Sequence, residues 1–155
     1  MKTLTITLIC TLCLFSACKK EIIAAAPVLD KEVRIQFPLN SYNFYGTTFQ
    51  FLPEYSYLLN FNKQDYPYVN LITFNVVMQA GNAKDSVYAR LFNVTDNVEV
   101  ANSTIIVSRS IPQQKPSANI YFTLPDKKID LAIQVKSFNN SQGIIQQPFL
   151  VLRRP

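Results

Sequence analysis

Four tyrosines, Tyr55, Tyr57, Tyr66 and Tyr68, carry the side chains of this chain that are best suited to bind a sugar. A tyrosine ring can stack on the apolar face of a sugar while its hydroxyl makes a hydrogen bond. The surrounding segment is aromatic throughout, since residues 42–68 hold ten of the nineteen aromatic residues. These four tyrosines are therefore candidate ligand-binding residues.

The same aromatic segment also fits a purely structural role. Aromatic residues are strong strand formers that mostly pack, so the phenylalanines would fill a core and the tyrosines would line a sheet edge. The chain has no Trp, the side chain most used for stacking on sugars. Both observations favour packing, and the two interpretations stay open.

Catalytic chemistry is limited by the residue types that are missing. The chain has no His, and its three Cys all lie within the first eighteen residues. Ser-His-Asp and Cys-His sites and His- or thiolate-bound metals are thereby excluded from the rest of the chain. Two facing carboxyl groups would serve a glycosidase, but the spacing of Glu32, Glu54 and Glu99 suggests no such pair, and a calcium site from Asp96, Asn97 and Glu99 lacks calcium-loop spacing. The sequence predicts no catalytic residue, no metal and no cofactor, with a carboxylate-based glycan-active enzyme as the alternative.

One short motif suggests a modification. Asp85-Ser86-Val87 resembles the motif at which some Gram-negative envelope proteins are O-glycosylated, and it lies in an expected exposed turn. Ser86 is therefore a candidate O-glycosylation site.

The first residues resemble the signal segment of a bacterial lipoprotein. Lys2 gives a positive start, residues 4–15 form an apolar stretch, and Ser16 and Ala17 are small residues before Cys18. The stretch is shorter than the about 20 residues that a membrane-spanning helix needs. The resemblance implies that residues 1–17 are removed and that Cys18 carries the lipid. It also places the protein at the outer membrane of a Gram-negative envelope, on its periplasmic or surface face, with the membrane as a partner.

The remaining chain divides into a tether and one domain. Residues 18–27 carry no turn signal and end at Pro27, which suits a lipidated tether reaching at most about 30 Å. Lipidation would use the last cysteine, so the domain would rest on its apolar core without disulfides. Residues 28–155 are enough for one core but not for two, and we expect a single domain.

The charge of this domain argues against nucleic acid as a partner. From Pro27 onward the chain has twelve Lys and Arg residues and nine Asp and Glu residues, a net charge of +3. The charges are scattered, whereas a nucleic-acid-binding protein gathers them on one face.

Apolar residues alternate with polar ones along most of the domain. Ile129, Leu131, Ile133 and Val135 show the period of a half-buried strand. Similar patterns predict further strands at residues 33–37, 57–61, 72–78, 87–91, 105–109, 118–124 and 149–153. The sequence thus predicts an all-β antiparallel sandwich of about eight strands. Only three glycines are present, so tight hairpins should be rare, which favours Greek-key or jelly-roll connections over a meander. A jelly-roll sandwich is expected, with an immunoglobulin-like sandwich as the alternative.

Residues 88–96, with the sequence YARLFNVTD, resemble a strand and turn that recur in jelly-roll modules of the carbohydrate-binding type. The order of the expected strands over residues 71–152 adds to this resemblance, which implies a jelly-roll fold. Independently of it, alternation places Arg90 and Phe92 on one face of the strand and Leu91 on the other.

Two functions are expected from these observations. The first is a lipid-anchored, non-catalytic envelope lipoprotein that acts as a binding module for a glycan or another surface polymer. The alternative is a structural or protein-interaction subunit of a cell-surface assembly, which would hold a surface protein partner through a sheet edge or the aromatic segment.

Overall fold

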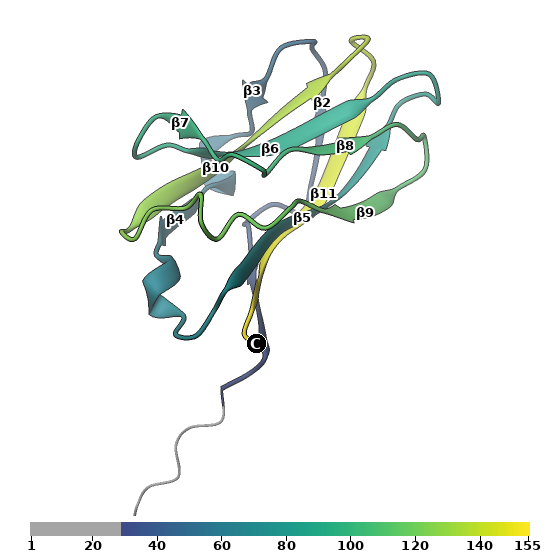
Figure 1. Ribbon diagram of the computed structural model, residues 1–155. Coiled ribbons are helices and arrows are strands. Elements are labelled where there is room, and N and C mark those ends of the chain that lie inside the picture. Colours follow the sequence, from purple (N-terminus) through teal and green to yellow (C-terminus); the bar gives the residue numbers. More distant parts are fainter. Residues whose placement is uncertain (1–28) are drawn as a thin grey trace, which may run out of the picture.

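The computed structural model describes residues 29–155, which fold into β-strands joined by loops and two short 3-10 helices. The predicted signal peptide (residues 1–17), the lipid attachment at Cys18 and the predicted tether (residues 18–27) lie outside the described residues and stay predictions. Figure 1 shows the strands stacked in two layers. The elements, in chain order, are β1 (Glu32–Gln36), β2 (Ser41–Phe44), β3 (Gln50–Phe51), η1 (Glu54–Ser56), β4 (Leu58–Phe61), η2 (Lys63–Asp65), β5 (Leu71–Ala80), β6 (Val87–Asn93), β7 (Val98–Glu99), β8 (Ile105–Val107), β9 (Gln113–Pro116), β10 (Ile129–Ser137) and β11 (Gly143–Arg153).

Each layer is one antiparallel sheet. The first sheet has β11 and β5 at its centre, β1 and β2 along one edge and β9 along the other. The second sheet has β10 and β6 at its centre, β3 and β4 along one edge and β7 and β8 along the other. At three of the edges two short strands lie end to end. β1 and β2 both pair with β11, β3 and β4 both pair with β10, and β7 and β8 both pair with β6. Counted by position, each sheet therefore has four strands, and the predicted number of about eight is confirmed.

The connections identify the type of sandwich. The chain crosses between the sheets after β2, β4, β5, β8, β9 and β10. Two four-position sheets with these crossings form a jelly roll. An immunoglobulin-like sandwich keeps its first two strand positions in one sheet, whereas here the first position (β1 with β2) and the second (β3 with β4) lie in opposite sheets. That alternative is excluded, and the predicted all-β jelly-roll sandwich is confirmed.

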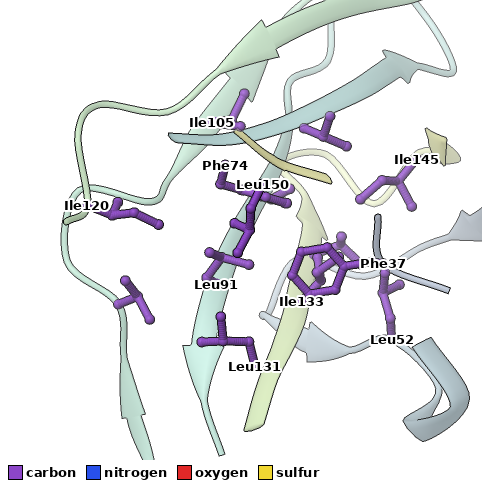
Figure 2. Close-up of a cluster of buried hydrophobic side chains, with 14 of the residues drawn as sticks. Phe37, Leu52, Phe74, Leu91, Ile105, Ile120, Leu131, Ile133, Ile145 and Leu150 are labelled. Atoms are coloured by element: carbon purple, nitrogen blue, oxygen red, sulfur yellow. The ribbon is translucent and has the colours of Figure 1, made fainter. Parts of the chain in front are cut away.

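The core lies between the two sheets and explains why the alternating sequences become strands. In β6 every second side chain is buried, as the alternating pattern predicts. Figure 2 shows Phe74 and Leu150 of the first sheet gathered with Leu91, Leu131 and Ile133 of the second. All five side chains are fully buried, and each contributes roughly 1.5–3 kcal/mol by leaving water. The two sheets thus share one core within residues 29–155.

The predicted strand at residues 118–124 is wrong. Ile120 is buried as expected, but Phe122 is exposed, and the chain turns there instead of extending. The Ser117 hydroxyl and the Asn119 side-chain oxygen accept hydrogen bonds from backbone N–H groups of β5, at 2.9 and 3.1 Å. Short polar side chains compete with the backbone for such bonds, so they replace a strand ladder here, and the observed strand is β9, just before.

At each end of the sandwich a buried charged side chain joins two of the connections between the sheets. At one end Lys63 of η2, in the β4–β5 connection, reaches the β9–β10 connection. Its Nζ atom donates to the carbonyl oxygens of Tyr121 and Leu124, at 3.0 and 2.6 Å, and lies 2.9 Å from Asp126 Oδ1. The hydrogen bond from Lys63 lowers the pKa of Asp126 below its ordinary value. A buried ammonium group needs such partners, so Lys63 fixes the two connections against each other.

At the opposite end the buried charge is Asp85, in the β5–β6 connection. Its carboxylate accepts hydrogen bonds from the Ser137 and Ser141 hydroxyls and from the N–H groups of Asn139 and Ser86. The first three donors belong to the end of β10 and the β10–β11 connection. Burial alone would raise the pKa of Asp85, but the hydrogen bonds outweigh it and hold the pKa well below its ordinary value. Asp85 therefore joins two crossings, as Lys63 does at the other end.

Candidate functional site

The four candidate tyrosines do not form one row. Tyr55, on η1, and Tyr68, before β5, are exposed, whereas Tyr57 and Tyr66 are half-buried. Tyr66 packs against the core and stacks on Phe61, with ring centroids 6.2 Å apart. No ring contact or hydrogen bond joins any two of the four. Their role in binding stays a prediction. If they bind a ligand, they bind it as separate residues and not as one continuous surface.

The Tyr57 hydroxyl is affected by its surroundings. Burial and the nearby Glu54 carboxylate raise its pKa above the ordinary value, so it remains a neutral donor at all physiological pH values.

Ser86 lies beside the buried Asp85 carboxylate rather than in a fully exposed turn. Asp85 is 1% exposed, which corrects the expectation that this motif is an exposed turn. Ser86 is half-buried, and its hydroxyl is 2.7 Å from the Ser108 hydroxyl, on the surface. The turn expectation failed because the Asp85 carboxylate folds inward to collect hydrogen bonds. Glycosylation of Ser86 stays a prediction.

Three of the four carboxylates considered for catalysis or calcium binding, Glu32, Glu99 and Asp96, lie beside cations. Glu32 pairs with Arg34 and Arg153, while Glu99 pairs with Arg90. The hydrogen bonds from both of its partners lower the pKa of Glu32.

Asp96, in the turn after β6, bonds to Lys127 and to the Asn93 amide. Within residues 29–155 no three His, Cys, Asp or Glu residues group as metal ligands. Neither 3-10 helix of this region has the length and apolarity required to span a bilayer.

The most distinctive surface feature is a hollow on the outer face of the first sheet, which we call the glutamine hollow. It has a volume of about 200 Å³. Its lining contains one aromatic ring, one guanidinium group and three amides, and no carboxyl group. The lining residues are Arg34 and Gln36 of β1, Gln114 of β9, and Gln147 and Phe149 of β11.

Two prolines lie beside the hollow. Pro38 follows the end of β1, and Pro148 lies within β11, directly before Phe149, the partner of Gln36. Because proline has no N–H to donate, it is found in sheets at edges and bulges. Against β5, Gln147 and Pro148 occupy the space of a single residue, which makes a β-bulge. Gln147 takes a φ of +43° there, a conformation that costs a residue other than glycine about 1 kcal/mol or more.

The bulge is held by defined contacts to the corner between β1 and β2. Gln147 N–H donates to the Asn40 carbonyl at 3.0 Å, and the Pro148 carbonyl accepts from Phe37 N–H at 3.0 Å and from the Gln36 amide at 3.1 Å. Phe37 is fully buried and anchors the corner in the core. The strained residue is therefore fixed in place by its surroundings.

Polar groups in the hollow keep hydrogen-bonding capacity. Among the described residues, no hydrogen bond engages the side-chain amide of Gln114 or Gln147. Arg34 donates through Nε to Glu32 at 2.9 Å, and its guanidinium carbon lies 5.5 Å from the centre of the Phe149 ring. Amides both donate and accept hydrogen bonds, so a ligand rich in hydroxyl groups fits this lining chemically.

The hollow was missed in the sequence because its residues are spread along the chain. Gln36 and Gln147 meet only through the order of the strands. One signal was present, since Gln147 and Pro148 interrupt an otherwise apolar run near the end of the sequence. A proline inside a strand pattern indicates an edge or a bulge, and the strand prediction began only after it.

The outer face of the second sheet is built differently. Arg90 and Phe92 share it and Leu91 points into the core, as alternation predicted. Arg90 Nε donates to Gln134 Oε1 at 2.8 Å, and a second nitrogen pairs with Glu99. Three polar side chains of this sheet, Arg90, Gln134 and Glu99, are thus paired with one another.

Aromatic rings cover the rest of this face. The Phe51 and Phe92 rings meet edge to face with centroids 5.1 Å apart. The Arg90 guanidinium carbon lies 3.9 Å from the centre of the Phe49 ring, and Lys136 Nζ lies 4.7 Å from the same ring. Such cation–π contacts stabilise by roughly 0.5–2 kcal/mol, so this face is largely satisfied by itself.

No family model and no curated protein matches this sequence. Solved structures do resemble the fold. One is the T13 viral particle of infectious bursal disease virus, at 6% identity and a TM-score of 0.51, over 87% of this chain and 34% of that one. Another is the CBM36-1 domain of a multidomain xylanase from the hindgut metagenome of Trinervitermes trinervoides, at 12% identity and a TM-score of 0.40, over 80% of this chain and 98% of that domain.

These similarities concern the fold alone. The chain spans about a third of the length of the viral protein that it matches. Because a jelly roll carries many unrelated functions, the function has to be argued from the surface of this chain.

Proposed function

We propose that this protein is a lipid-anchored, non-catalytic envelope lipoprotein whose jelly-roll domain binds a glycan, with the glutamine hollow as the site. The observation that carries the proposal is the lining of the hollow, in which the free Gln114 and Gln147 amides occur together with the Phe149 ring beside a β-bulge. Sugar hydroxyls both donate and accept, so they match amides, while the Phe149 ring offers an apolar surface to the sugar ring.

The size of the hollow favours part of a polymer as the ligand. Its volume of about 200 Å³ is below the 300–1,000 Å³ of pockets that enclose small-molecule ligands. It is therefore suited to one ring-sized unit of a longer chain that continues over the surface. The lipid anchor in this proposal rests on the resemblance of residues 1–18 to a lipoprotein signal.

Affinity electrophoresis through gels containing soluble polysaccharides tests the proposal. We expect one or more polysaccharides to retard the protein. The double variant Gln114→Ala and Gln147→Ala should weaken this binding about tenfold, the effect of losing roughly 1.4 kcal/mol of hydrogen bonding. Gln50→Ala, an exposed glutamine of the second sheet, is the matched control and should bind as the unmodified protein does.

Two results would count against the proposal in different ways. Retardation that the double variant leaves unchanged would remove the hollow as the site, and Tyr66→Ala and Tyr68→Ala would then test the tyrosines. No retardation by any polysaccharide would remove glycan binding itself.

One observation favours a second function, a subunit of a cell-surface assembly. The outer face of the second sheet exposes Phe51, Leu59 and Ile106 and also carries Arg90, and aromatic residues and Arg are enriched at protein interfaces. This function predicts that purification of the native lipoprotein brings a fixed protein partner, which Phe51→Ser should release. Isolation as a lone monomer would contradict it.

A further inference from the structure

The chain enters the domain at the end of the sandwich where it also leaves. Arg154 N–H donates to the Lys31 carbonyl at 3.0 Å, and the Arg154 guanidinium group donates to the Asp30 and Pro67 carbonyls. Figure 1 shows the first described residues beside the C-terminus. The segment that precedes residue 29 therefore starts from this end, which we call the tether end.

The β9–β10 connection belongs to the same end. The Asn119 amide donates to the Asn70 carbonyl at 3.2 Å, and Asn70 N–H donates to the Arg153 carbonyl at 3.2 Å. Three segments that are distant in sequence thus meet around the entry of the chain.

The tether end carries two large side chains that are almost fully exposed. Phe122 is 83% exposed and Tyr68 is 77% exposed, the highest values among the large hydrophobic residues that the structure describes. Phe122 packs edge to face on Tyr121, with centroids 5.1 Å apart, and Lys63 fixes the Tyr121 backbone. Tyr68 has a φ of +65°, in the left-handed region that side chains other than glycine seldom adopt. Both rings are therefore presented outward by rigid supports.

We propose that the tether end faces the lipid bilayer and that Phe122 and Tyr68 contact its interfacial layer. The proposal rests on the lipid anchor of the proposed function. The preceding chain leaves from this end and, with Cys18 as its lipid attachment, would reach at most about 30 Å, which keeps this end nearest the membrane. Aromatic side chains favour the membrane–water interface, where an apolar ring is buried and a polar group stays wet.

The charges at this end indicate that the contact is apolar rather than electrostatic. Arg153 pairs with Glu32, and Lys127 pairs with Asp96. Positive and negative groups are close to balanced, so the contact should persist at high salt, which screens exposed charges. The exposed or half-buried charged side chains here are Lys31, Lys127, Lys128, Arg153 and Arg154, with Asp30, Glu32, Asp65, Asp96, Asp126 and Asp130.

Single tryptophans test this orientation, because the chain has no Trp of its own. The lipidated full-length protein carrying Phe122→Trp or Tyr68→Trp is reconstituted into phosphatidylcholine vesicles with brominated acyl chains. We expect blue-shifted emission and quenching by bromine, unchanged in 1 M NaCl. The matched control is Phe138→Trp, which follows β10 at the opposite end and is 64% exposed, and its emission should stay unquenched.

The outcomes separate this inference from the proposed function. If the protein floats with the vesicles while the Phe122→Trp and Tyr68→Trp variants emit like the control, the orientation is overturned and the anchor still stands. Protein that fails to float with the vesicles, or whose intact mass shows no lipid on Cys18, would remove the lipid anchor and the orientation with it.

Discussion

Both sheets of this sandwich are built from alternating sequences, but the polar side chains on their outer faces differ in how they are hydrogen-bonded. On the second sheet, Arg90 satisfies Gln134, Glu99 and the Phe49 ring at once. On the first sheet, the Gln114 and Gln147 amides line a hollow with no bond to the described residues. A regular ladder lets neighbouring side chains pair across strands, whereas a bulge separates them. Polar composition alone therefore does not identify a binding face.

The largest expected effect comes from Asp85, whose buried carboxylate joins the β5–β6 connection to the β10–β11 connection. Asp85→Asn should lower the free energy of unfolding by about 3 kcal/mol at pH 7, because hydrogen bonds to a charged group are worth roughly 1.5–3 kcal/mol each and are not additive. The pKa of Asp85 is lowered in the folded protein, so this stabilisation is present above the unfolded pKa of about 4 and is lost as the pH falls below it. Urea unfolding at several pH values measures both. An unchanged difference between pH 7 and pH 3 would contradict the charge-based explanation.

Next in size is the difference between the two arginines. Arg90→Ala should cost about 2 kcal/mol of unfolding free energy, since it leaves the buried Gln134 amide without a partner. Arg34→Ala, on the exposed first-sheet face, should leave the free energy of unfolding almost unchanged, because exposed ion pairs contribute little. Urea denaturation of the two variants side by side measures this contrast. Equal losses would mean that the two faces do not differ as described.

The bulge should give a smaller effect of opposite sign. Gln147→Gly should raise the free energy of unfolding by about 1 kcal/mol, because glycine adopts positive φ without strain, and should weaken polysaccharide binding. The neighbouring Gln146 lies in the regular ladder, so Gln146→Gly should destabilise by roughly 0.5–1 kcal/mol. Thermal unfolding with affinity electrophoresis measures both properties. A destabilised Gln147→Gly variant would show that the bulge is not strained.

The smallest effect is expected at Ser86. Ser86→Ala removes the hydroxyl contact with Ser108, an exposed interaction worth about 0.5 kcal/mol. Intact mass measurement of the protein from its native cells tests the O-glycosylation prediction at the same residue. If the protein without the substitution is heavier than the Ser86→Ala variant by only one oxygen atom, Ser86 is not a glycosylation site.

The sequence predicted the fold well where alternation is uninterrupted. β6 and β10 were found because apolar residues recur at every second position of each and these residues are buried in the core. The burial of Gln134, on the other face of β10, was not predicted. The error at residues 118–124 arose because Ser117 and Asn119 bond to β5 through their side chains, which hydropathy does not record.

The candidate site was harder to predict for a topological reason. Gln36, Gln114 and Gln147 converge only after β1, β11, β5 and β9 are placed side by side. The tyrosines are close in sequence, yet Tyr68 turns outward at positive φ while Tyr66 packs on Phe61. Proximity along a chain that turns this sharply is a poor guide to proximity in space.

The place where β1 lies has a mechanical consequence. β1 is the first strand after the chain enters, and its five residues pair with the last residues of β11. A pull from a membrane anchor would act along β1, so these backbone bonds would bear the load together in shear rather than open one after another. Behind them, the buried Phe37 would have to leave the core before the force could travel farther into the domain.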